Sequence, residues 1–168
     1  MESYVETRLR ELEAVCRRIG ARVTHQRREV LRAVVSTDIH PDAQTILARV
    51  RERMPTISFD TVYRTLTFLE DHGLIQRVHV SGDRARFDGN NHVHHHFICT
   101  RCGRVVDFEN EAFDDIALPP HIRALGTSLT TQLQVFGICM ECNESKGGLD
   151  AQARGGEATH DGGRHPRG

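Results

Sequence analysis

Residues 92–103 read His-Val-His-His-His-Phe-Ile-Cys-Thr-Arg-Cys-Gly, and this run limits what the chain can fold into more than any other feature. It places four histidines and a C-x2-C pair within one short segment. Imidazole and thiolate are common transition-metal ligands, and neither core packing nor an ordinary surface explains so many together. A second C-x2-C pair follows at Cys139 and Cys142. We therefore expect two metal sites that share one strand, one structural and one functional.

The paired cysteines predict a structural zinc site. Each C-x2-C pair presents two thiolates from a tight turn, and two such turns can complete a tetrahedron around Zn²⁺ with no open position. The alternatives are a redox-active cysteine pair or two disulfides. A reducing compartment such as the cytosol makes paired C-x2-C motifs more often metal sites than disulfides. The four predicted ligands are Cys99, Cys102, Cys139 and Cys142.

The histidine cluster predicts a second site. In a strand, alternate side chains share a face, so His94 and His96 would point one way and His95 the other. The nearest carboxylates in the sequence are those of Asp88 and Asp107. The alternative is a solvated polar face.

Apolar residues recur at helical spacing in four segments before residue 74. We expect the first helix to end at Gly20, the second to be capped by Thr24, and the third to begin at His40-Pro41-Asp42. The fourth would begin at Ser58 and close at Gly73. Its predicted inward-facing residues are Phe59, Val62, Leu66 and Leu69.

The β-branched residues of segment 74–80 predict a strand, a Ser-Gly-Asp turn follows, and segment 84–88 is the expected return strand of a β-hairpin. Helices followed by a hairpin outline a winged helix-turn-helix, whose fourth helix would enter the major groove of DNA. The first 88 residues carry 15 Lys and Arg against 13 Asp and Glu, so a nucleic-acid surface should lie there, although solvated surface charge is the alternative. The candidate DNA contacts are Arg22, Thr24, Arg27, Ser58, Thr61, Tyr63, Arg64, Arg84 and Arg86.

The remaining chain predicts a small domain. Strands are expected at 93–99 and 104–108, with a third strand leading to Cys139 and a short helix beginning at Pro119-Pro120. So little surface can be buried here that metal binding and dimerisation should support the fold. The predicted class is α+β: a winged-helix domain at 1–88, a linker at 89–91, a dimerisation and metal-binding domain at 92–145 and a disordered tail at 146–168.

The 168 residues contain no apolar run of membrane-spanning length, and the acidic start lacks a signal-peptide core. We therefore expect a cytoplasmic protein without a membrane partner.

Seven segments together resemble the Fur (ferric uptake regulator) family of bacterial metal-dependent repressors, from about Arg10 to Cys142. They are 22–27, 40–41, 58–66, 86–88, 94–103, 106–108 and 137–142. The resemblance implies a homodimer that binds a double-stranded DNA operator with an inverted repeat. It also implies one structural Zn²⁺ per chain and a regulatory metal between the two domains.

Within that family the chain is most similar to the peroxide-sensing branch, PerR. Iron-sensing members more often have Glu at the positions of Asp88 and Asp107, and a further metal site of those members is interrupted here at Val93 and Thr131. The resemblance implies that peroxide oxidises His40 and His94. It implies regulatory Fe²⁺ or Mn²⁺ at His40, Asp88, His94, His96 and Asp107.

Three functions remain in competition. The favoured one is a metal-dependent, DNA-binding repressor that responds to peroxide and is not an enzyme. The second is a regulator of iron or another divalent metal without peroxide chemistry. The third is a non-haem iron enzyme, because His and carboxylate ligands with an open position also describe oxygenases. The sequence shows no sign of a substrate pocket, and this argues against the third function.

Overall fold

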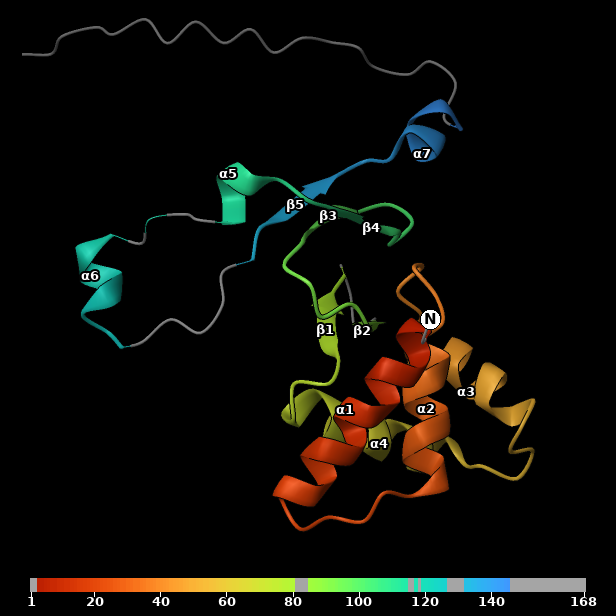
Figure 1. Cartoon of the computed structure of the whole chain (residues 1–168). Coiled ribbons are helices and arrows are strands. Elements are labelled where there is room, and N and C mark those ends of the chain that lie inside the picture. Colours follow the sequence, from red (N-terminus) through yellow and green to blue (C-terminus); the bar gives the residue numbers. More distant parts are fainter. Residues whose placement is uncertain (1–2, 81–84, 115–116, 118, 127–131, 146–168) are drawn as a thin grey trace, which may run out of the picture.

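A computed structural model describes residues 3–80, 85–114, 117, 119–126 and 132–145 of the chain. The described residues form a helical half followed by a half built on a small sheet (Figure 1). The predicted α+β class is confirmed. The predicted turn at 81–83, Arg84 and the predicted disordered tail lie outside the described residues.

Four helices make up the first half, and each begins at a side-chain cap. Ser3, Thr24, Asp42 and Ser58 each accept a hydrogen bond from a backbone N–H in the first helical turn. The third helix begins later than predicted: Asp42 caps it by accepting from Thr45 N at 2.8 Å, which leaves the preceding His-Pro pair outside the helix. The helices are α1 (Tyr4–Arg18), α2 (His25–Val35), α3 (Ala43–Arg51) and α4 (Phe59–Asp71).

The apolar faces of these helices meet in one core. Leu12, Val34, Ile46 and Leu66 are each fully buried there. The prediction that Phe59 faces inward was wrong, because Phe59 begins α4 beyond the reach of this core and is 40% exposed.

A hairpin and a three-stranded sheet complete the fold. Strands β1 (Gln76–His79) and β2 (Ala85–Asp88) pair antiparallel. In the sheet, the central strand β3 (His95–Cys99) runs antiparallel to β4 (Val105–Phe108) and parallel to β5 (Gln134–Gly137).

Three short helices accompany the sheet: α5 (Glu111–Asp114), α6 (Pro120–Arg123) and α7 (Met140–Glu144). The sequence analysis predicted only α6.

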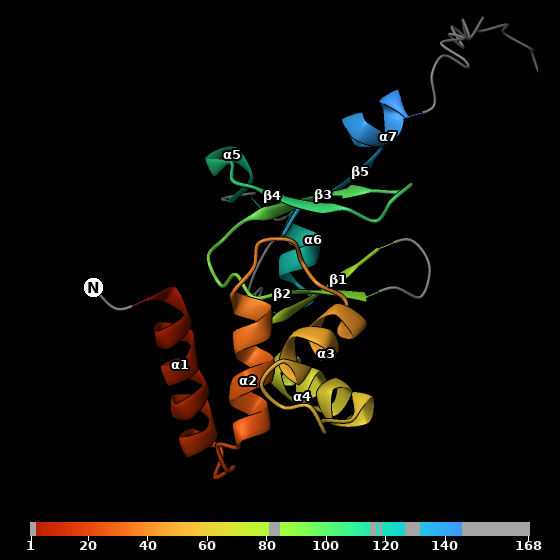
Figure 2. The same cartoon turned by 90° about the vertical axis from the view of Figure 1, so that its right-hand side faces the viewer.

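Figure 2 shows the hairpin lying beneath the sheet, and a second, smaller core joins the two. It consists of Val78 and Val80 from the hairpin side together with Ile98 and Val105 from the sheet. The two halves are therefore in apolar contact, and the domain boundaries at 1–88, 89–91 and 92–145 remain a prediction.

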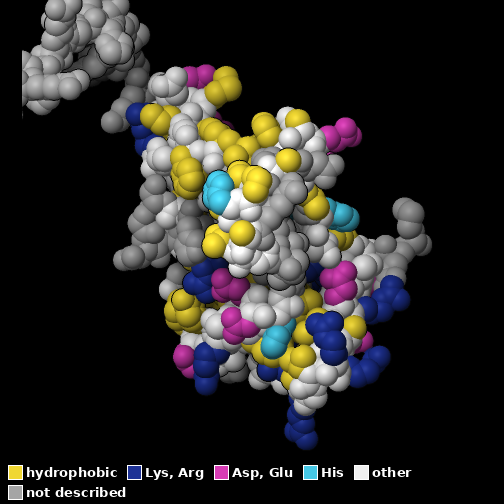
Figure 3. Space-filling view, turned by 90° about the vertical axis from the view of Figure 1, so that its left-hand side faces the viewer, with side chains coloured by type: hydrophobic (Ala, Val, Ile, Leu, Met, Phe, Trp, Pro, Cys, Tyr) yellow, Lys and Arg dark blue, Asp and Glu magenta, His cyan; other side chains and the backbone are white. Residues whose placement is uncertain are grey.

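Several large apolar side chains stay exposed in the second half. Figure 3 shows hydrophobic side chains gathered over the upper part of one face, and Lys and Arg around the lower part. Exposed fractions reach 56% for Phe136 and 77% for Met140. No helix within the described segments is long and apolar enough to cross a membrane.

Gly89, at the start of the predicted linker, packs directly against the end of α2. A Cβ added at Gly89 would lie 2.9 Å from Val35 Cγ1 and 3.0 Å from Val35 Cα. We therefore predict that Gly89→Ala lowers the free energy of unfolding by about 1–3 kcal/mol, because an inserted methyl group overpacks this contact. Chemical denaturation would measure the loss.

The double variant Val35→Ala, Gly89→Ala provides the control. Removing the Val35 methyl groups should reduce the cost of the added methyl without abolishing it, because the Val35 Cα remains close. Equal stability of Gly89→Ala and the wild type would contradict the packing described here.

Candidate metal centres

The four paired cysteines converge at one end of the sheet. Cys99 ends β3, Cys102 follows it in a turn, and Cys139 and Cys142 lie at the start of α7. All four Sγ atoms lie within 4.8 Å of one another. The parallel pairing of β3 with β5 brings the two cysteine pairs together by placing Cys99 beside Gly137.

The geometry of this cluster fits a tetrahedral zinc ion. Zn–S bonds of ~2.3 Å place two ligand sulfurs about 3.8 Å apart at the edge of a tetrahedron. The Sγ atoms of Cys102 and Cys139 are 3.8 Å apart. Four soft donors with no fifth partner are the ligand set of a closed structural site.

The thiols of this cluster differ in acidity. The backbone N–H groups of Cys139 and Cys102 lower the pKa of Cys99 to about 6, whereas hydrogen bonds with Cys102 and Cys139 raise the pKa of Cys142 to about 12. The cluster thus carries negative charge at neutral pH, and further ionisation requires a cation.

A second cluster forms where the hairpin meets the sheet. His40 comes from the loop between α2 and α3, Asp88 ends β2, His94 precedes β3, His96 lies in β3 and Asp107 lies in β4. The Nε2 atom of His40 lies 2.9 Å from Asp107 Oδ1 and 3.6 Å from Asp88 Oδ1. The Nε2 atoms of His94 and His96 lie 2.9 and 3.4 Å from Asp88 Oδ2.

The structure thus brings together all five side chains that the resemblance implied for the regulatory metal. His40, Asp88, His94 and His96 are buried, while the side chain of Asp107 is 28% exposed.

Several donor atoms in this cluster are buried and face one another. The contacts of His40 Nε2, Asp88 Oδ2 and Asp107 Oδ1 within the described residues are with other members of the cluster. Buried ligand-type atoms that converge in this way, without hydrogen bonds to the surrounding protein, suggest a bound ion. Two nitrogen ligands ~2.1 Å from one ion, with an N–metal–N angle of about 90°, lie about 3.0 Å apart. The Nε2 atoms of His94 and His96 are 3.0 Å apart. The donor set therefore fits a single divalent metal.

The backbone and a nearby arginine hold His40 in place. Its φ angle is +48°, the only positive value for a non-glycine residue in the described part of the chain. Arg86 donates from Nη1 to the His40 carbonyl at 3.1 Å, and the Phe87 N–H donates to the Pro41 carbonyl at 3.0 Å. Strand β2 therefore fixes the loop that presents this imidazole.

Two ionisable groups of the cluster are strongly perturbed. Burial alone would raise the pKa of Asp88, but hydrogen bonds from His94 and His96 and the backbone N–H of Asn90 outweigh it and hold that pKa well below its usual range. The hydrogen bond between His94 and Asp88 raises the pKa of His94 to about 9 and outweighs the lowering effect of burial. A metal that binds His94 at neutral pH must therefore displace a proton.

His95 points away from this cluster, as the strand alternation predicted. Its Nδ1 atom accepts a hydrogen bond from the Leu133 N–H at 3.2 Å, and its Nε2 atom lies 3.1 Å from Asp114 Oδ1. The rings of Phe108 and Phe113 flank the fully buried imidazole. Its contacts tie α5 and the residue before β5 to the central strand of the sheet.

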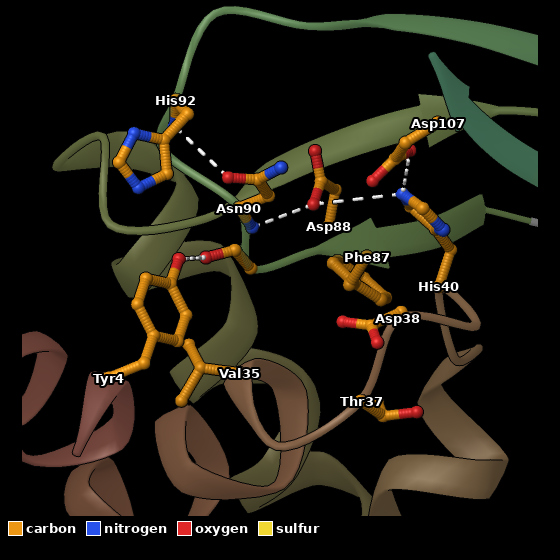
Figure 4. Close-up of a pocket in the computed structure, with 11 residues that line it drawn as sticks. Tyr4, Val35, Thr37, Asp38, His40, Phe87, Asp88, Asn90, His92 and Asp107 are labelled. Carbon is orange, nitrogen blue, oxygen red and sulfur yellow. Dashed lines mark hydrogen bonds and ion pairs between the residues drawn. The ribbon is translucent and has the colours of Figure 1, made fainter. Parts of the chain in front are cut away.

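A cavity of about 220 Å³ opens beside the second cluster (Figure 4). Figure 4 shows Asp88, Asp107 and His40 pointing toward one another at one side of it, and Tyr4 at the other. The cavity provides a route by which a small molecule can reach the buried donor atoms.

The predicted DNA contacts divide into groups. Thr24 and Arg27 from α2 and Thr61 and Arg64 from α4 line one groove. Arg27 donates from Nη1 to the Arg22 carbonyl at 2.6 Å. Five of the nine candidates thus lie in or beside one surface.

The other four candidates lie elsewhere. Ser58 caps α4, and Tyr63 is 42% exposed on that helix. The guanidinium of Arg86 contacts the His40 carbonyl beside the metal cluster, and Arg84 lies outside the described residues.

The sequence analysis did not single out Tyr4 and Arg8, whose side chains contact the segment that follows Asp88. A signal was available: Arg8 falls on the apolar face of α1, beside Leu9 and Leu12, where a charged residue is unusual.

Comparison with known proteins relates the chain to regulators. The sequence profile described as "Ferric uptake regulator family" matches residues 18–129. The peroxide-responsive repressor PerR of Staphylococcus epidermidis is 32% identical over 141 residues, which cover 83% of this chain and 93% of the relative. The PerR of Staphylococcus aureus is 33% identical over 141 residues, with 83% and 95% coverage.

Two solved structures are similar to the chain over most of their length. The Helicobacter pylori ferric uptake regulator Fur superimposes with a TM-score of 0.70 at 25% identity, covering 87% of this chain and 99% of the other. A zinc uptake regulator complexed with zinc and DNA gives a TM-score of 0.58 at 29% identity, with 86% and 98% coverage.

The cysteine cluster predicts the effect of removing one ligand. Cys99→Ser should lose one equivalent of zinc per chain and destabilise the sheet half, because metal-binding energy contributes to folding. Elemental analysis of the purified protein would measure the metal content. Cys16→Ala is the matched control, because Cys16 is buried in the helical core away from the cluster. Full zinc content in Cys99→Ser would rule out this site.

Proposed function

The chain belongs to the ferric uptake regulator family, and from this premise we propose that it is a metal-dependent repressor that releases DNA when peroxide oxidises its regulatory site. The observation that carries the proposal is the buried cluster of three imidazoles and two carboxylates. It draws His40 and Asp88 from the helix-and-hairpin half, and His94, His96 and Asp107 from the sheet half. An ion bound there would hold the two halves in one orientation.

The two clusters suit different metals. We assign one structural Zn²⁺ per chain to Cys99, Cys102, Cys139 and Cys142, because thiolates favour zinc in a closed tetrahedral site. Nitrogen and oxygen donors suit Fe²⁺ or Mn²⁺, which we assign to the second cluster. This division keeps the metal that stabilises the fold apart from the metal that regulates it.

Metal binding affects the position of the DNA-binding helices through His40. This residue lies just before α3, and Arg86 and Phe87 tie its loop to β2. Binding therefore selects the arrangement of the helical half in which His40 faces the sheet. A ligand that prefers one of two arrangements shifts their populations by its difference in affinity.

The same site is suited to peroxide sensing. Fe²⁺ held by the three imidazoles and two carboxylates of the cluster would supply the redox chemistry that activates peroxide, with no net change in the iron over the whole reaction. One oxygen atom of hydrogen peroxide is inserted into a carbon–hydrogen bond of a ligand imidazole, and the other leaves as water. His40 and His94 are our proposed targets among the imidazoles of the cluster, because the resemblance to the peroxide-sensing branch points to these two. The added oxygen weakens ligation by His40, so the two halves are no longer held in one orientation and DNA is released.

DNA contact is assigned to α4 and the start of α2. Thr24, Arg27, Thr61 and Arg64 combine hydroxyl groups and guanidinium groups in one groove, which suits phosphates and base edges. The side chain of Arg64 is 73% exposed and pairs with the equally exposed Asp60 at 2.7 Å, a surface contact that it can exchange for a base or a phosphate. The exposed apolar residues of the sheet half favour a homodimer, whose two copies of α4 would contact an inverted repeat.

We predict that peroxide adds one oxygen atom to the peptides carrying His40 or His94 in the Fe²⁺ form only, in parallel with loss of DNA binding. The Mn²⁺ form should keep both its mass and its DNA affinity, because Mn²⁺ lacks the reactivity toward peroxide that Fe²⁺ has. Mass spectrometry and electrophoretic mobility shift on the same samples would measure both. A metal regulator without peroxide sensing would bind DNA with either metal and show no such release. Release that follows cysteine oxidation and zinc loss would overturn the proposed mechanism.

We predict that Arg64→Ala weakens specific DNA binding by about 1–3 kcal/mol if this side chain contacts a base. Fluorescence anisotropy with a DNA fragment selected from a random library by the Mn²⁺ form would measure it. Arg18→Ala is the control, because Arg18 is exposed at the end of α1 outside the groove. Unchanged affinity in Arg64→Ala would show that a different face of α4 meets DNA.

A further inference from the structure

We propose that Tyr4, Arg8 and Glu11 of α1 form a connector that positions Asp88 and couples metal occupancy to α4; the coupling to DNA rests on the function proposed above. The three residues are spaced at i, i+4 and i+7, so they share one face of the helix. Their polar atoms all contact the segment after Asp88 or the chain after α4. The connector therefore joins three parts of the protein that are far apart in the sequence.

Arg8 is the centre of the connector. Its side chain is 1% exposed, yet it carries a full charge. Nη1 donates to the Gly89 carbonyl at 2.6 Å and Nη2 donates to the Leu74 carbonyl at 2.5 Å. Nε pairs with Glu11 Oε2 at 2.8 Å. One guanidinium thus holds the residue after Asp88 and the chain after α4 at a fixed separation.

Tyr4 and Glu11 strengthen the contact with the same segment. The Tyr4 hydroxyl donates to the Gly89 carbonyl at 2.9 Å, an interaction drawn in Figure 4. Asn91 donates from Nδ2 to the Glu11 carboxylate at 3.4 Å. Residues 89–91 are therefore held to α1 from both sides of Arg8.

Hydrogen bonds continue from this segment into the metal cluster. Asp88 Oδ1 accepts from the Asn90 N–H at 2.7 Å, and Asn90 Oδ1 accepts from the His92 N–H at 3.1 Å. The His92 carbonyl lies 2.8 Å from His94 Nδ1, which directs His94 Nε2 toward the cluster. The segment that α1 holds therefore orients two of the five proposed ligands.

The other end of the connector reaches α4. Leu74 lies just beyond α4, and its N–H donates to the Leu69 carbonyl at 2.8 Å at the helix end. Arg8 holds the carbonyl of this same Leu74. Displacement of Gly89 away from α1 therefore breaks the Nη1 contact and loosens the guanidinium whose Nη2 holds the end of the proposed recognition helix.

The choice of residue supports a role beyond packing. Arg8 lies among apolar residues of α1, where Leu or Met would fill the space without burying a charge. Burying a guanidinium is costly unless its donors are satisfied, and such groups often specify one arrangement rather than add stability. Here the arrangement specified is that of α1, residues 89–91 and the end of α4.

The experiment compares Arg8→Met and Tyr4→Phe with the wild type and with Arg17→Met, an exposed arginine of the same helix. Each zinc-loaded protein is titrated with Mn²⁺, and its affinity for the selected DNA fragment is measured with and without Mn²⁺. Arg8→Met should weaken Mn²⁺ binding and shrink the Mn²⁺-dependent gain in DNA affinity by ~2–30-fold. Tyr4→Phe, which loses one hydroxyl, should do so by ~2–10-fold. Arg17→Met should match the wild type.

Hydrogen exchange separates this inference from the proposed function. Backbone amides at 90–92 should exchange faster in Arg8→Met and Tyr4→Phe than in Arg17→Met. If the wild type shows no Mn²⁺-dependent DNA binding, the proposed function fails, while the Mn²⁺ affinities and exchange rates still test the connector. Variants that melt at lower temperature but keep wild-type Mn²⁺ affinity and exchange would overturn the connector. Tyr4→Phe keeps the test valid if Arg8→Met does not fold.

Discussion

The arrangement of the two halves depends on two carboxylates that face three imidazoles in a largely buried space. Without a cation, protons on its neighbours balance the negative charge of Asp88, and His94, whose Nε2 lies 2.9 Å from Asp88 Oδ2 and whose pKa this contact raises, is the favoured carrier of one such proton. A divalent metal would replace that proton and would also engage His40 and Asp107, whose Nε2 and Oδ1 atoms lie 2.9 Å apart. The contact between the halves therefore depends on which cation occupies it, and the surrounding loops and strands serve to bring the ligands to one point.

Much of this arrangement could be predicted from the sequence, because the relevant patterns are local. The spacing of the cysteine pairs predicted their convergence, and strand alternation placed His94 and His96 together and His95 apart. The structure brings the five residues of the family resemblance to one site, including His40, which no local pattern connects to β3.

The features that escaped prediction depend on tertiary contacts. Arg8 lies 81 residues from the Gly89 carbonyl that it contacts. Arg86, predicted as a DNA contact, donates to the His40 carbonyl across 46 residues, a contact that the sequence did not indicate. The inward prediction for Phe59 followed helical periodicity, which does not reveal that the first turn of α4 extends beyond the core.

The small core between hairpin and sheet has a mechanical consequence. Among the described residues its buried members are Val78, Val80, Ile98 and Val105, and all four are aliphatic. Smooth apolar surfaces of this kind can slide past each other in a shear motion while they stay dry. The halves can therefore change orientation without opening the core to water, so rearrangement avoids the large cost of exposing apolar surface. The protein can switch states while it remains fully folded.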